Sequence, residues 1–290
     1  MGSANEMSRS GGFRPHWPPR AIPALSAICV SLLGTGCQRP PVPATGPTFS
    51  VLTQNVCYTM PAAERTVQAI RQADADVVCL QETSPAWEAL LRKELGEQYR
   101  YMRFRHVAGA GGQGFLSKFR FEDVYYRKAE GTWHPGWLIR VDTPAGRVQI
   151  LNVHLRPPVA KAADGAYRFS LGAYFGSKQV RRRQLEQLLG WVDHTRPTLV
   201  VGDLNEPEGG RAVSYARGEK GFRDALSQFD PWSHTWKVGR WPLWAGARLD
   251  HILHTPDLQC LHARVIKQTG SDHRPVVARF QAKQPGAAAE

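Results

Sequence analysis

The stretch TLVVGDLNEP, residues 198–207, places polar residues directly after a run that favours a buried strand. Its first four residues are apolar or β-branched, as is typical of a strand in a core. Asp203 and Asn205 follow two positions apart, and residues two apart in a strand point to the same face. Burying a carboxylate and an amide without partners is costly, so the pattern predicts that both hold something at a strand end.

Similar strand patterns continue on both sides of this stretch. Strands are expected at residues 48–56, 76–82, 99–106, 114–119, 121–128, 136–155, 198–205, 247–255, 258–267 and 274–280. The fourth and fifth of these are expected to pair with each other. The sixth is expected to be a hairpin that turns near Pro144–Gly146.

Helical patterns alternate with these strands. Helices are expected at residues 61–75, 84–98 and 178–192. Pro61 suits the first turn of the first helix, and Ser84 followed by Pro85 is an N-cap pattern for the second. Many strands, few helices and two similar halves predict an α/β sandwich, with two sheets packed face to face and the helices outside.

Composition agrees with a folded domain. The chain has 290 residues, of which 42% are hydrophobic and nine are Trp, and this excludes a disordered protein. Its net charge of +12 would attract phosphates or anionic membranes, although positive charge spread evenly over a surface serves solubility alone. Five Cys without a CxxC pair indicate neither a disulfide framework nor a zinc site.

The first residues have the pattern of an export signal. Arg9, Arg14 and Arg20 precede an apolar run that is short for a membrane span and ends in LLGTGC at Cys37. This ending resembles a bacterial lipoprotein signal, in which the Cys becomes lipidated, but Leu33 lies one place too early. Cleavage without lipidation is the alternative. Either way, the protein is expected outside the cytoplasm, lipid-anchored in the cell envelope or secreted.

These patterns divide the chain into four parts. They are a signal peptide at 1–37, an extended Pro-rich tether at 38–47, one domain at 48–283 and a flexible tail at 284–290.

Acids, amides and imidazoles recur at the ends of the expected strands of the domain. They are Asn55, Glu82, His154, Asp203, Asn205, Asp250, Asp272 and His273. Each alone has an ordinary explanation: His154 would be a core histidine, Asp250 would pair with Arg248, and Asp272 would form an Asx turn. Together they are harder to explain that way, because several unrelated strands would each bury a polar terminus.

The set suits the hydrolysis of a phosphate ester. That reaction needs charge neutralisation, an oriented water and help for the leaving oxygen. Hard oxygen ligands such as those of Glu82 and Asn55 suit Mg²⁺. A His held by a carboxylate suits proton transfer or stabilisation of the transition state.

The motifs TQN, LQE, NVHL, GDLNEP, RLDHIL and SDHRP, in this order, resemble the endonuclease/exonuclease/phosphatase superfamily over residues 49–280. Its members include pancreatic-type DNase, exonuclease III-like enzymes, sphingomyelinases and inositol-phosphate phosphatases. The resemblance implies a four-layer α/β/β/α sandwich of two mainly antiparallel sheets. It also implies a metal-dependent hydrolase that uses Mg²⁺, with Mn²⁺ as a substitute.

The resemblance further implies roles at matched positions. Glu82 would bind the metal with Asn55 beside it, and Asp272 would lie near the metal. His154 would contact the scissile phosphate, while Asp203 would orient or activate the attacking water. Asn205 would fix the water or the phosphate, and His273, held by Asp250, would lie beside the phosphorus.

The substrate remains open between several classes. RLDHIL is closer to nucleases and general phosphodiesterases than to inositol phosphatases, so nucleic acid is expected first. A phospholipid or small phosphodiester is the alternative, and a non-catalytic surface-tethered binding module is a third reading. The protein is expected to be a monomer, with membrane association through lipidated Cys37.

Two clusters could contact such a substrate. Residues 231–247 carry four Trp with Lys237 and Arg240, and in the family this loop approaches the site. Within it, Trp236 is expected in the core. Arg181, Arg182 and Arg183 are expected on a solvated helix face, with phosphate contact as the alternative.

Overall fold

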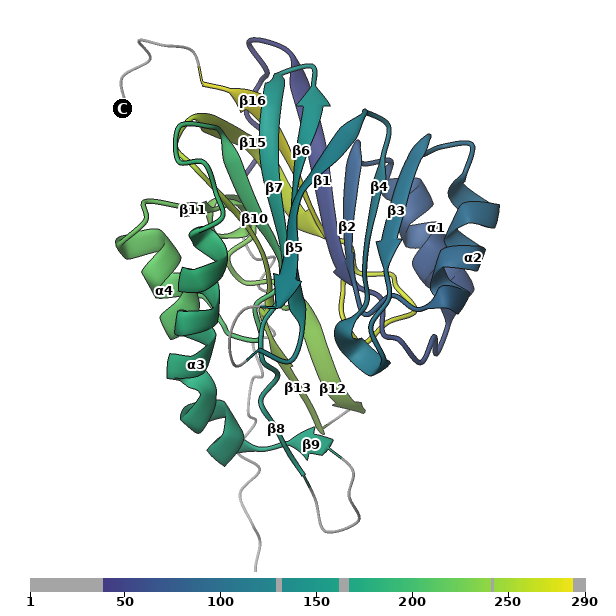
Figure 1. Cartoon of the computed structure of the whole chain (residues 1–290), viewed down its shortest axis with the longest axis vertical. Coiled ribbons are helices and arrows are strands. Elements are labelled where there is room, and N and C mark those ends of the chain that lie inside the picture. Colours follow the sequence, from purple (N-terminus) through teal and green to yellow (C-terminus); the bar gives the residue numbers. More distant parts are fainter. Residues whose placement is uncertain (1–38, 129–131, 162–166, 241–242, 284–290) are drawn as a thin grey trace, which may run out of the picture. The chain divides into compact units, whose positions relative to one another are not determined.

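The structure is a computed structural model that describes residues 39–128, 132–161, 167–240 and 243–283. The predicted signal peptide and the predicted tail lie outside these residues. In the described part, two six-stranded sheets pack face to face and helices cover their outer faces (Figure 1). The predicted α/β/β/α sandwich is therefore confirmed.

The first sheet has the strand order β15-β16-β1-β2-β4-β3. Its strands are β1 (Thr48–Asn55), β2 (Val77–Gln81), β3 (Tyr101–Arg105), β4 (Gln113–Ser117), β15 (Leu258–Val265) and β16 (Val276–Ala282). All neighbours are antiparallel except β1 and β2, which run parallel.

The second sheet has the order β11-β14-β10-β7-β6-β5. Its strands are β5 (Phe121–Lys128), β6 (Pro135–Thr143), β7 (Gly146–His154), β10 (Thr198–Asp203), β11 (Arg223–Asp224) and β14 (Asp250–His254). Again one neighbouring pair, β7 and β10, is parallel. The two sheets thus repeat one plan, with a parallel pair in the middle of each.

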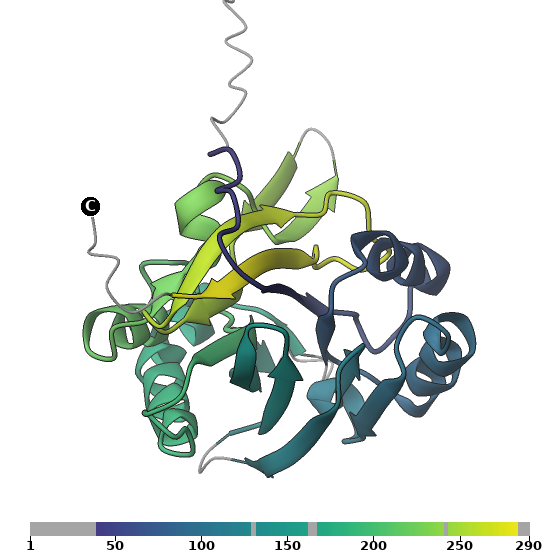
Figure 2. The ribbon, with the colours of Figure 1, turned by 90° about the horizontal axis from the view of Figure 1, so that it is seen from above.

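The helices connect these strands on the outside. They are α1 (Ala63–Ala73), α2 (Pro85–Leu95), α3 (Leu171–Leu189), α4 (Arg211–Gly218), the short α5 (Ala225–Phe229) and the 3₁₀ turn η1 (Gly109–Gly111). Ser84 caps α2 as predicted, since its hydroxyl accepts a hydrogen bond from the Trp87 N–H at 3.3 Å. Seen from above, α1 and α2 cover one sheet while α3 and α4 cover the other (Figure 2).

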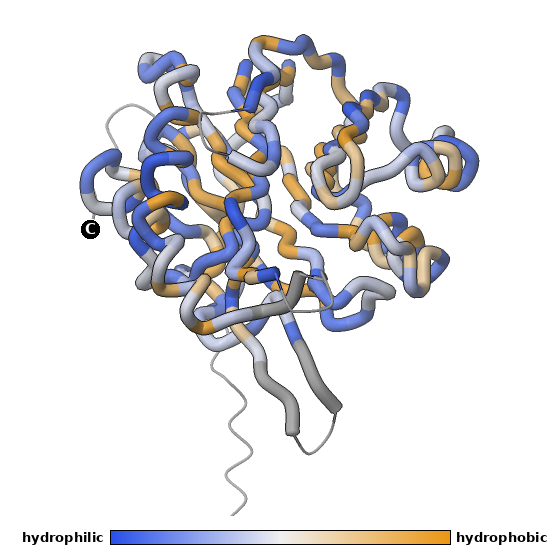
Figure 3. Tube along the Cα trace, turned by 60° about the horizontal axis from the view of Figure 1, so that its bottom comes forward, coloured by the Kyte–Doolittle hydropathy of each residue, from blue (hydrophilic) through white to orange (hydrophobic). Residues whose placement is uncertain are grey.

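The central strands β1, β2, β7 and β10 are buried on both faces along most of their length, which explains why they are nearly continuous apolar runs in the sequence. In β1, Val51 points between the sheets and Leu52 points toward the helices of its own side. In β10, Val201 likewise points between the sheets, and Val200 points toward the helices of its own side. Figure 3 shows hydrophobic segments of the chain in the interior of the domain. Three apolar layers therefore hold the four layers of backbone together.

The structure differs from three of the sequence predictions. The segments 114–119 and 121–128 do not pair, because β4 belongs to the first sheet and β5 to the second. Helix α1 begins at Ala63, so Pro61 precedes it. Helix α3 begins at Leu171, seven residues before the predicted start, because Ser170 caps it by accepting a hydrogen bond from the Ala173 N–H at 3.3 Å.

The segment predicted as a tether lies along the domain in its described part. The N–H groups of Arg39 and Val42 donate to the carbonyls of Phe229 and Leu261 at 2.9 and 2.7 Å. Val42 also packs against the core between the sheets. Residues 39–47 have no helix or strand, but hydrogen bonds hold them to the domain.

Two small hairpins, β8–β9 (Val159–Lys161 and Tyr167–Phe169) and β12–β13 (Trp236–Arg240 and Leu243–Ala247), project from the same end of the sandwich (Figure 1). In the described part of the chain, no helix is long and apolar enough to cross a membrane.

Candidate active site

The site forms where the two parallel strand pairs end. β1 ends at Asn55 and β2 is followed by Glu82, while β7 and β10 end at His154 and Asp203. The carboxyl ends of parallel strands meet at one edge of a sheet, so each sheet presents two of these residues together. Asn55 joins the sheets, because its Nδ2 donates to Glu82 Oε1 at 2.9 Å and to Asp203 Oδ2 at 3.2 Å.

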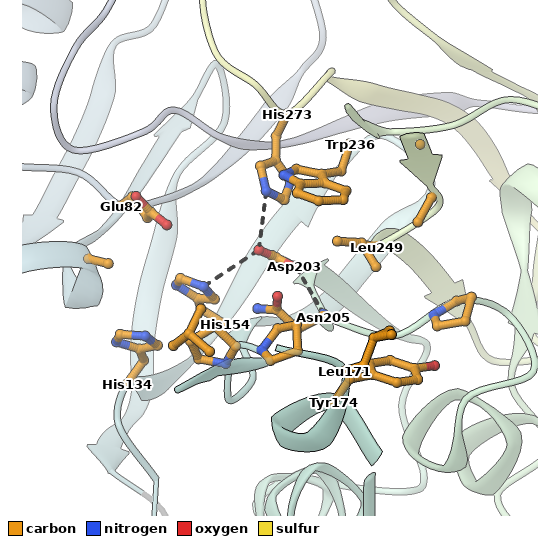
Figure 4. A pocket seen from close by; sticks show the side chains of 17 residues that line it. Glu82, His134, His154, Leu171, Tyr174, Asp203, Asn205, Trp236, Leu249 and His273 are labelled. Carbon is orange, nitrogen blue, oxygen red and sulfur yellow. Dashed lines mark hydrogen bonds and ion pairs between the residues drawn. The ribbon is translucent and has the colours of Figure 1, made fainter. Parts of the chain in front are cut away.

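These residues open onto a cavity of about 430 Å³. Figure 4 shows Glu82, His154, Asp203, Asn205 and His273 around one side of it. Most of the remaining lining is apolar, and its apolar wall consists of Pro157, Pro158, Val159, Leu171, Tyr174, Pro207 and Leu249. A ligand in the cavity would therefore meet both ionisable groups and hydrocarbon.

Asp203 lies between two imidazoles. Its Oδ2 is 3.5 Å from His154 Nε2 and 3.8 Å from His273 Nε2, and all three side chains are buried. Neither separation is a direct hydrogen bond of ordinary length, and all three residues line the cavity, so they can bind a water or a substrate oxygen that lies in it beside them.

Asp250 holds His273 from behind. Its Oδ2 lies 2.8 Å from His273 Nδ1, and its backbone N–H donates to the Thr235 hydroxyl at 3.0 Å. The Ser271 hydroxyl accepts from the His273 N–H at 3.1 Å and donates to the Asn55 carbonyl at 2.8 Å. His273 is thus fixed in orientation, with Nε2 toward the cavity.

The two imidazoles have opposite pKa shifts. Burial lowers the pKa of His154, and the nearby Asp203 carboxylate only partly offsets this. Burial would also lower the pKa of His273, but the carboxylates of Asp250 and Asp203 outweigh it and raise that pKa to about 10. Near neutral pH one imidazole is therefore neutral and the other charged, and such divergence is how acid and base roles separate.

Asn205 lies beside Asp203 for a reason other than strand alternation. The strand ends at Asp203, and Asn205 adopts a left-handed backbone with φ of 51°. Its N–H donates to Asp203 Oδ1 at 2.9 Å, and its Nδ2 donates to the Leu155 carbonyl at 3.0 Å. The turn, and not a shared strand face, keeps the carboxylate and the amide together.

Glu82 and Asp272 supply hard oxygen donors for a divalent cation. Burial raises the pKa of Glu82, and the negative charge of Asp272 raises it further, so a cation between them would be favoured. Asp272 is oriented by Trp236, whose Nε1 donates to its Oδ2 at 3.2 Å. Asn55 contacts Glu82, but its Oδ1 already accepts a hydrogen bond from the Cys57 N–H at 3.0 Å.

Asp203, Asp250 and His273 also have ligand atoms within 4.8 Å of one another. This trio fits a metal less well, because Asp250 and His273 Nδ1 are already committed to each other at 2.8 Å. The donor chemistry thus favours Glu82 and Asp272 as the metal-holding pair.

The structure shows one cavity residue that the sequence did not indicate, and it places two other residues differently from the prediction. His134 lines the cavity and stacks on His154, with ring centroids 4.2 Å apart. Trp236, expected in the core, lines the cavity instead. Arg181, expected on a solvated face, is fully buried. Arg181 lies four residues before Leu185, on the buried face of α3, and this helical spacing could have predicted its burial.

Comparisons with known proteins concern the family of this chain and its fold. The model of the endonuclease/exonuclease/phosphatase family matches residues 52–273. An inositol phosphosphingolipids phospholipase C of Saccharomyces cerevisiae is 28% identical over 237 residues, which cover 66% of this chain and 48% of that protein. The chain thus spans about half the length of this curated relative.

Solved structures show the same fold. An endonuclease/exonuclease/phosphatase from Beutenbergia cavernae has a TM-score of 0.66 at 21% identity, covering 84% of this chain and 74% of that one. TDP2 of D. rerio complexed with single strand DNA product has a TM-score of 0.62 at 19% identity, covering 81% and 99%. At these identities the likeness concerns the fold alone.

Proposed function

Since the chain belongs to the endonuclease/exonuclease/phosphatase family, we propose that it is a metal-dependent phosphodiesterase that cleaves nucleic acid. The observation that carries this proposal is the Asp203 carboxylate placed between the Nε2 atoms of His154 and His273. A carboxylate and two imidazoles around one space can orient a water and receive a phosphate.

In the proposed reaction, water attacks phosphorus and the ester oxygen departs. Asp203 orients the water and accepts its proton, a role that suits a carboxyl whose pKa is raised by burial. His273, held by Asp250, donates a hydrogen bond to a phosphoryl oxygen as charge develops there, and His154 contacts the phosphate from the other side.

A divalent cation would complete the site. Glu82 and Asp272 would hold it with Asn55 beside them, and Mg²⁺, with Mn²⁺ as a substitute, would neutralise charge on the phosphate.

A second candidate substrate is a phospholipid or another amphiphilic phosphodiester. The observation that favours it is the apolar wall of the cavity, which would accommodate hydrocarbon next to the phosphate. The similarity to a phospholipase C supports this candidate, while the net charge of +12 is compatible with both.

The first test is cleavage of supercoiled plasmid and of bis(p-nitrophenyl) phosphate, each with Mg²⁺ and with EDTA. We expect EDTA to stop both reactions and His273→Ala to slow them about 1000-fold. His106→Ala is the matched control, since His106 pairs with Glu88 on the surface at 2.6 Å, and it should leave the rates unchanged.

Each other result has a defined meaning. Hydrolysis of the small diester without plasmid nicking would refute the nucleic-acid assignment and favour the amphiphilic candidate. No hydrolysis of plasmid, small diester or phospholipid, in a protein that binds phosphate, would refute the enzyme and support a binding module.

We also propose that the protein is exported and held in the cell envelope through Cys37. The support is the basic and apolar pattern of residues 1–37, which precedes the domain.

A further inference from the structure

Three arginines in a row on α3 have different environments. Arg181 is fully buried, Arg182 is half-buried and pairs with Glu219 at 3.1 Å, and Arg183 is exposed. A buried guanidinium cannot be deprotonated at ordinary pH, so its contacts must satisfy its charge and its N–H groups.

The guanidinium of Arg181 uses four of its five N–H groups on described partners. Nε donates to Glu206 Oε1 at 2.9 Å. Nη1 donates to the Ser177 hydroxyl at 2.6 Å and to the Arg156 carbonyl at 3.3 Å. Nη2 donates to the Tyr174 carbonyl at 3.0 Å. One side chain therefore joins three separate segments of backbone.

Two of these segments form the apolar wall of the cavity. Arg156 is followed directly by Pro157 and Pro158, and Tyr174 lines the cavity from the first turns of α3. The guanidinium carbon also lies 5.2 Å from the centre of the Tyr174 ring. Arg181 thus contacts Tyr174 through both its backbone and its ring.

The third segment is the loop that follows Asp203. Glu206 comes directly after Asn205, and its other carboxylate oxygen accepts the Ala212 N–H at 2.7 Å. Its backbone carbonyl lies 2.9 Å from His251 Nε2. Because Glu206 is held in place, the position of the neighbouring Asn205 is restricted as well.

Stability alone does not account for this arrangement. A buried ion pair pays a large desolvation penalty, and well-packed apolar side chains of similar volume often serve a fold as well or better. The planar fork of Arg, by contrast, fixes the directions of several acceptors at once. All of its acceptors here belong to elements that border the cavity.

We propose that Arg181 is a positioning residue that sets the apolar wall of the cavity against the loop that follows Asp203 and carries Asn205. It acts through Glu206, Tyr174 and Arg156 and does not touch the reacting atoms. The expected effect of Arg181 on kcat rests on the proposed phosphodiesterase function, whereas its expected effect on the position of the loop does not.

The test compares Arg181→Lys and Arg181→Met with Arg183→Met, the exposed matched control. For each full-length variant, kcat and KM for bis(p-nitrophenyl) phosphate are measured well below its melting temperature, together with Mg²⁺ affinity by calorimetry. Because a small displacement of reacting groups has a large effect, we expect kcat to fall about 100-fold in Arg181→Lys. Mg²⁺ affinity should stay unchanged, since Glu82 and Asp272 lie beyond the reach of this network. Arg183→Met should behave as the unmodified protein.

Unchanged kcat in folded Arg181→Lys would overturn the proposal. A parallel fall of kcat, Mg²⁺ affinity and melting temperature would also overturn it, because a purely structural role would then suffice. If Arg181→Met does not fold, Glu206→Gln replaces it and should lower kcat without changing Mg²⁺ affinity.

One further measurement separates this inference from the proposed function. If the unmodified protein hydrolyses no phosphodiester, the function fails, but amide hydrogen exchange still tests the positioning role. The N–H groups of Asn205 and Ala212 should exchange faster in Arg181→Lys than in Arg183→Met. Equal exchange in the two variants would refute the role of Arg181.

Discussion

At the scale of single residues, chemically identical side chains differ in their surroundings. His154 and His273 approach the same oxygen of Asp203, yet burial lowers the pKa of one and two carboxylates raise that of the other to about 10. The sequence indicated both imidazoles but not this difference. The resemblance implied that Asp250 holds His273, but nothing in the sequence indicated that His134 stacks on His154.

Another buried histidine, His251, allows the charge of a buried pair to be tested. Its Nδ1 lies 2.7 Å from Asp224 Oδ2, and both side chains are fully buried. Burial alone would lower the pKa of His251, but the charge and hydrogen bond of Asp224 raise it above 6.5. Burial alone would raise the pKa of Asp224, but His251 lowers it below 3.8.

The sign of each shift defines a pH window. The contribution of His251 to the free energy of unfolding is complete below pH 6.5 and is lost as the pH rises through its raised pKa. The contribution of Asp224 to the free energy of unfolding is complete above pH 3.8 and is lost as the pH falls through its lowered pKa. Between pH 3.8 and 6.5 the pair is fully stabilising.

We therefore expect His251→Leu to lower the unfolding free energy by about 3 kcal/mol within this window, because it leaves Asp224 buried and unpaired. The loss should shrink at alkaline pH. Urea denaturation across a pH series measures it, with the half-exposed His262 changed to Leu as the control. A loss that does not vary with pH would contradict a charged pair.

At the scale of elements, the ends of the parallel strand pairs β1–β2 and β7–β10 position the site residues. Gly202 shows how closely β10 approaches β7, because it has φ of 135° and a Cβ there would lie 2.0 Å from the Val153 carbonyl oxygen. Only glycine tolerates both the conformation and the contact. The next residue is Asp203, so this local geometry sets where the carboxylate emerges.

We expect Gly202→Ala to lower the unfolding free energy by about 3 kcal/mol and to reduce activity, since backbone strain and overlap both oppose it. Gly209→Ala is the control, because a Cβ there meets nothing within 4 Å. Thermal unfolding and hydrolysis rates measure both effects. Equal stability of the two variants would contradict the packing described here.

Element prediction failed where tertiary contacts outweigh local pattern. Residues 114–119 and 121–128 have equally good strand patterns and are joined by a short connection, so a hairpin was the expected result. Their burial in different sheets became apparent only with the tertiary pairing of β4 with β2 and β3, and of β5 with β6.

At the scale of the whole molecule, the site exists only because the sheets pack face to face. Asn55 of one sheet reaches Asp203 of the other at 3.2 Å, and Gln81 Nε2 reaches Asn152 Oδ1 at 2.7 Å. These buried polar contacts set the offset between the sheets, because an unpaired polar group there would be destabilising.

A prediction at this scale concerns Cys37. We expect the full-length protein, produced in a bacterial host, to fractionate with membranes and to carry a lipid on Cys37, because anchoring then depends on a covalent chain. Cys37→Ser should release the protein from the membrane fraction. Intact mass and fractionation measure this. A protein that is cleaved without a lipid and is soluble in both forms would show that the alternative signal is used.

The sequence by itself determined the alternation of strands and helices, the capping of α2 by Ser84 and the polar residues at strand ends. These features follow from local periodicity, from capping chemistry and from the cost of burying polar groups, all of which act over a few residues. Only the tertiary structure decided which sheet β4 and β5 join, that Trp236 borders the cavity and that Arg181 is buried. These outcomes depend on which distant segments pack together, and the burial and charge of a side chain are properties of that packing.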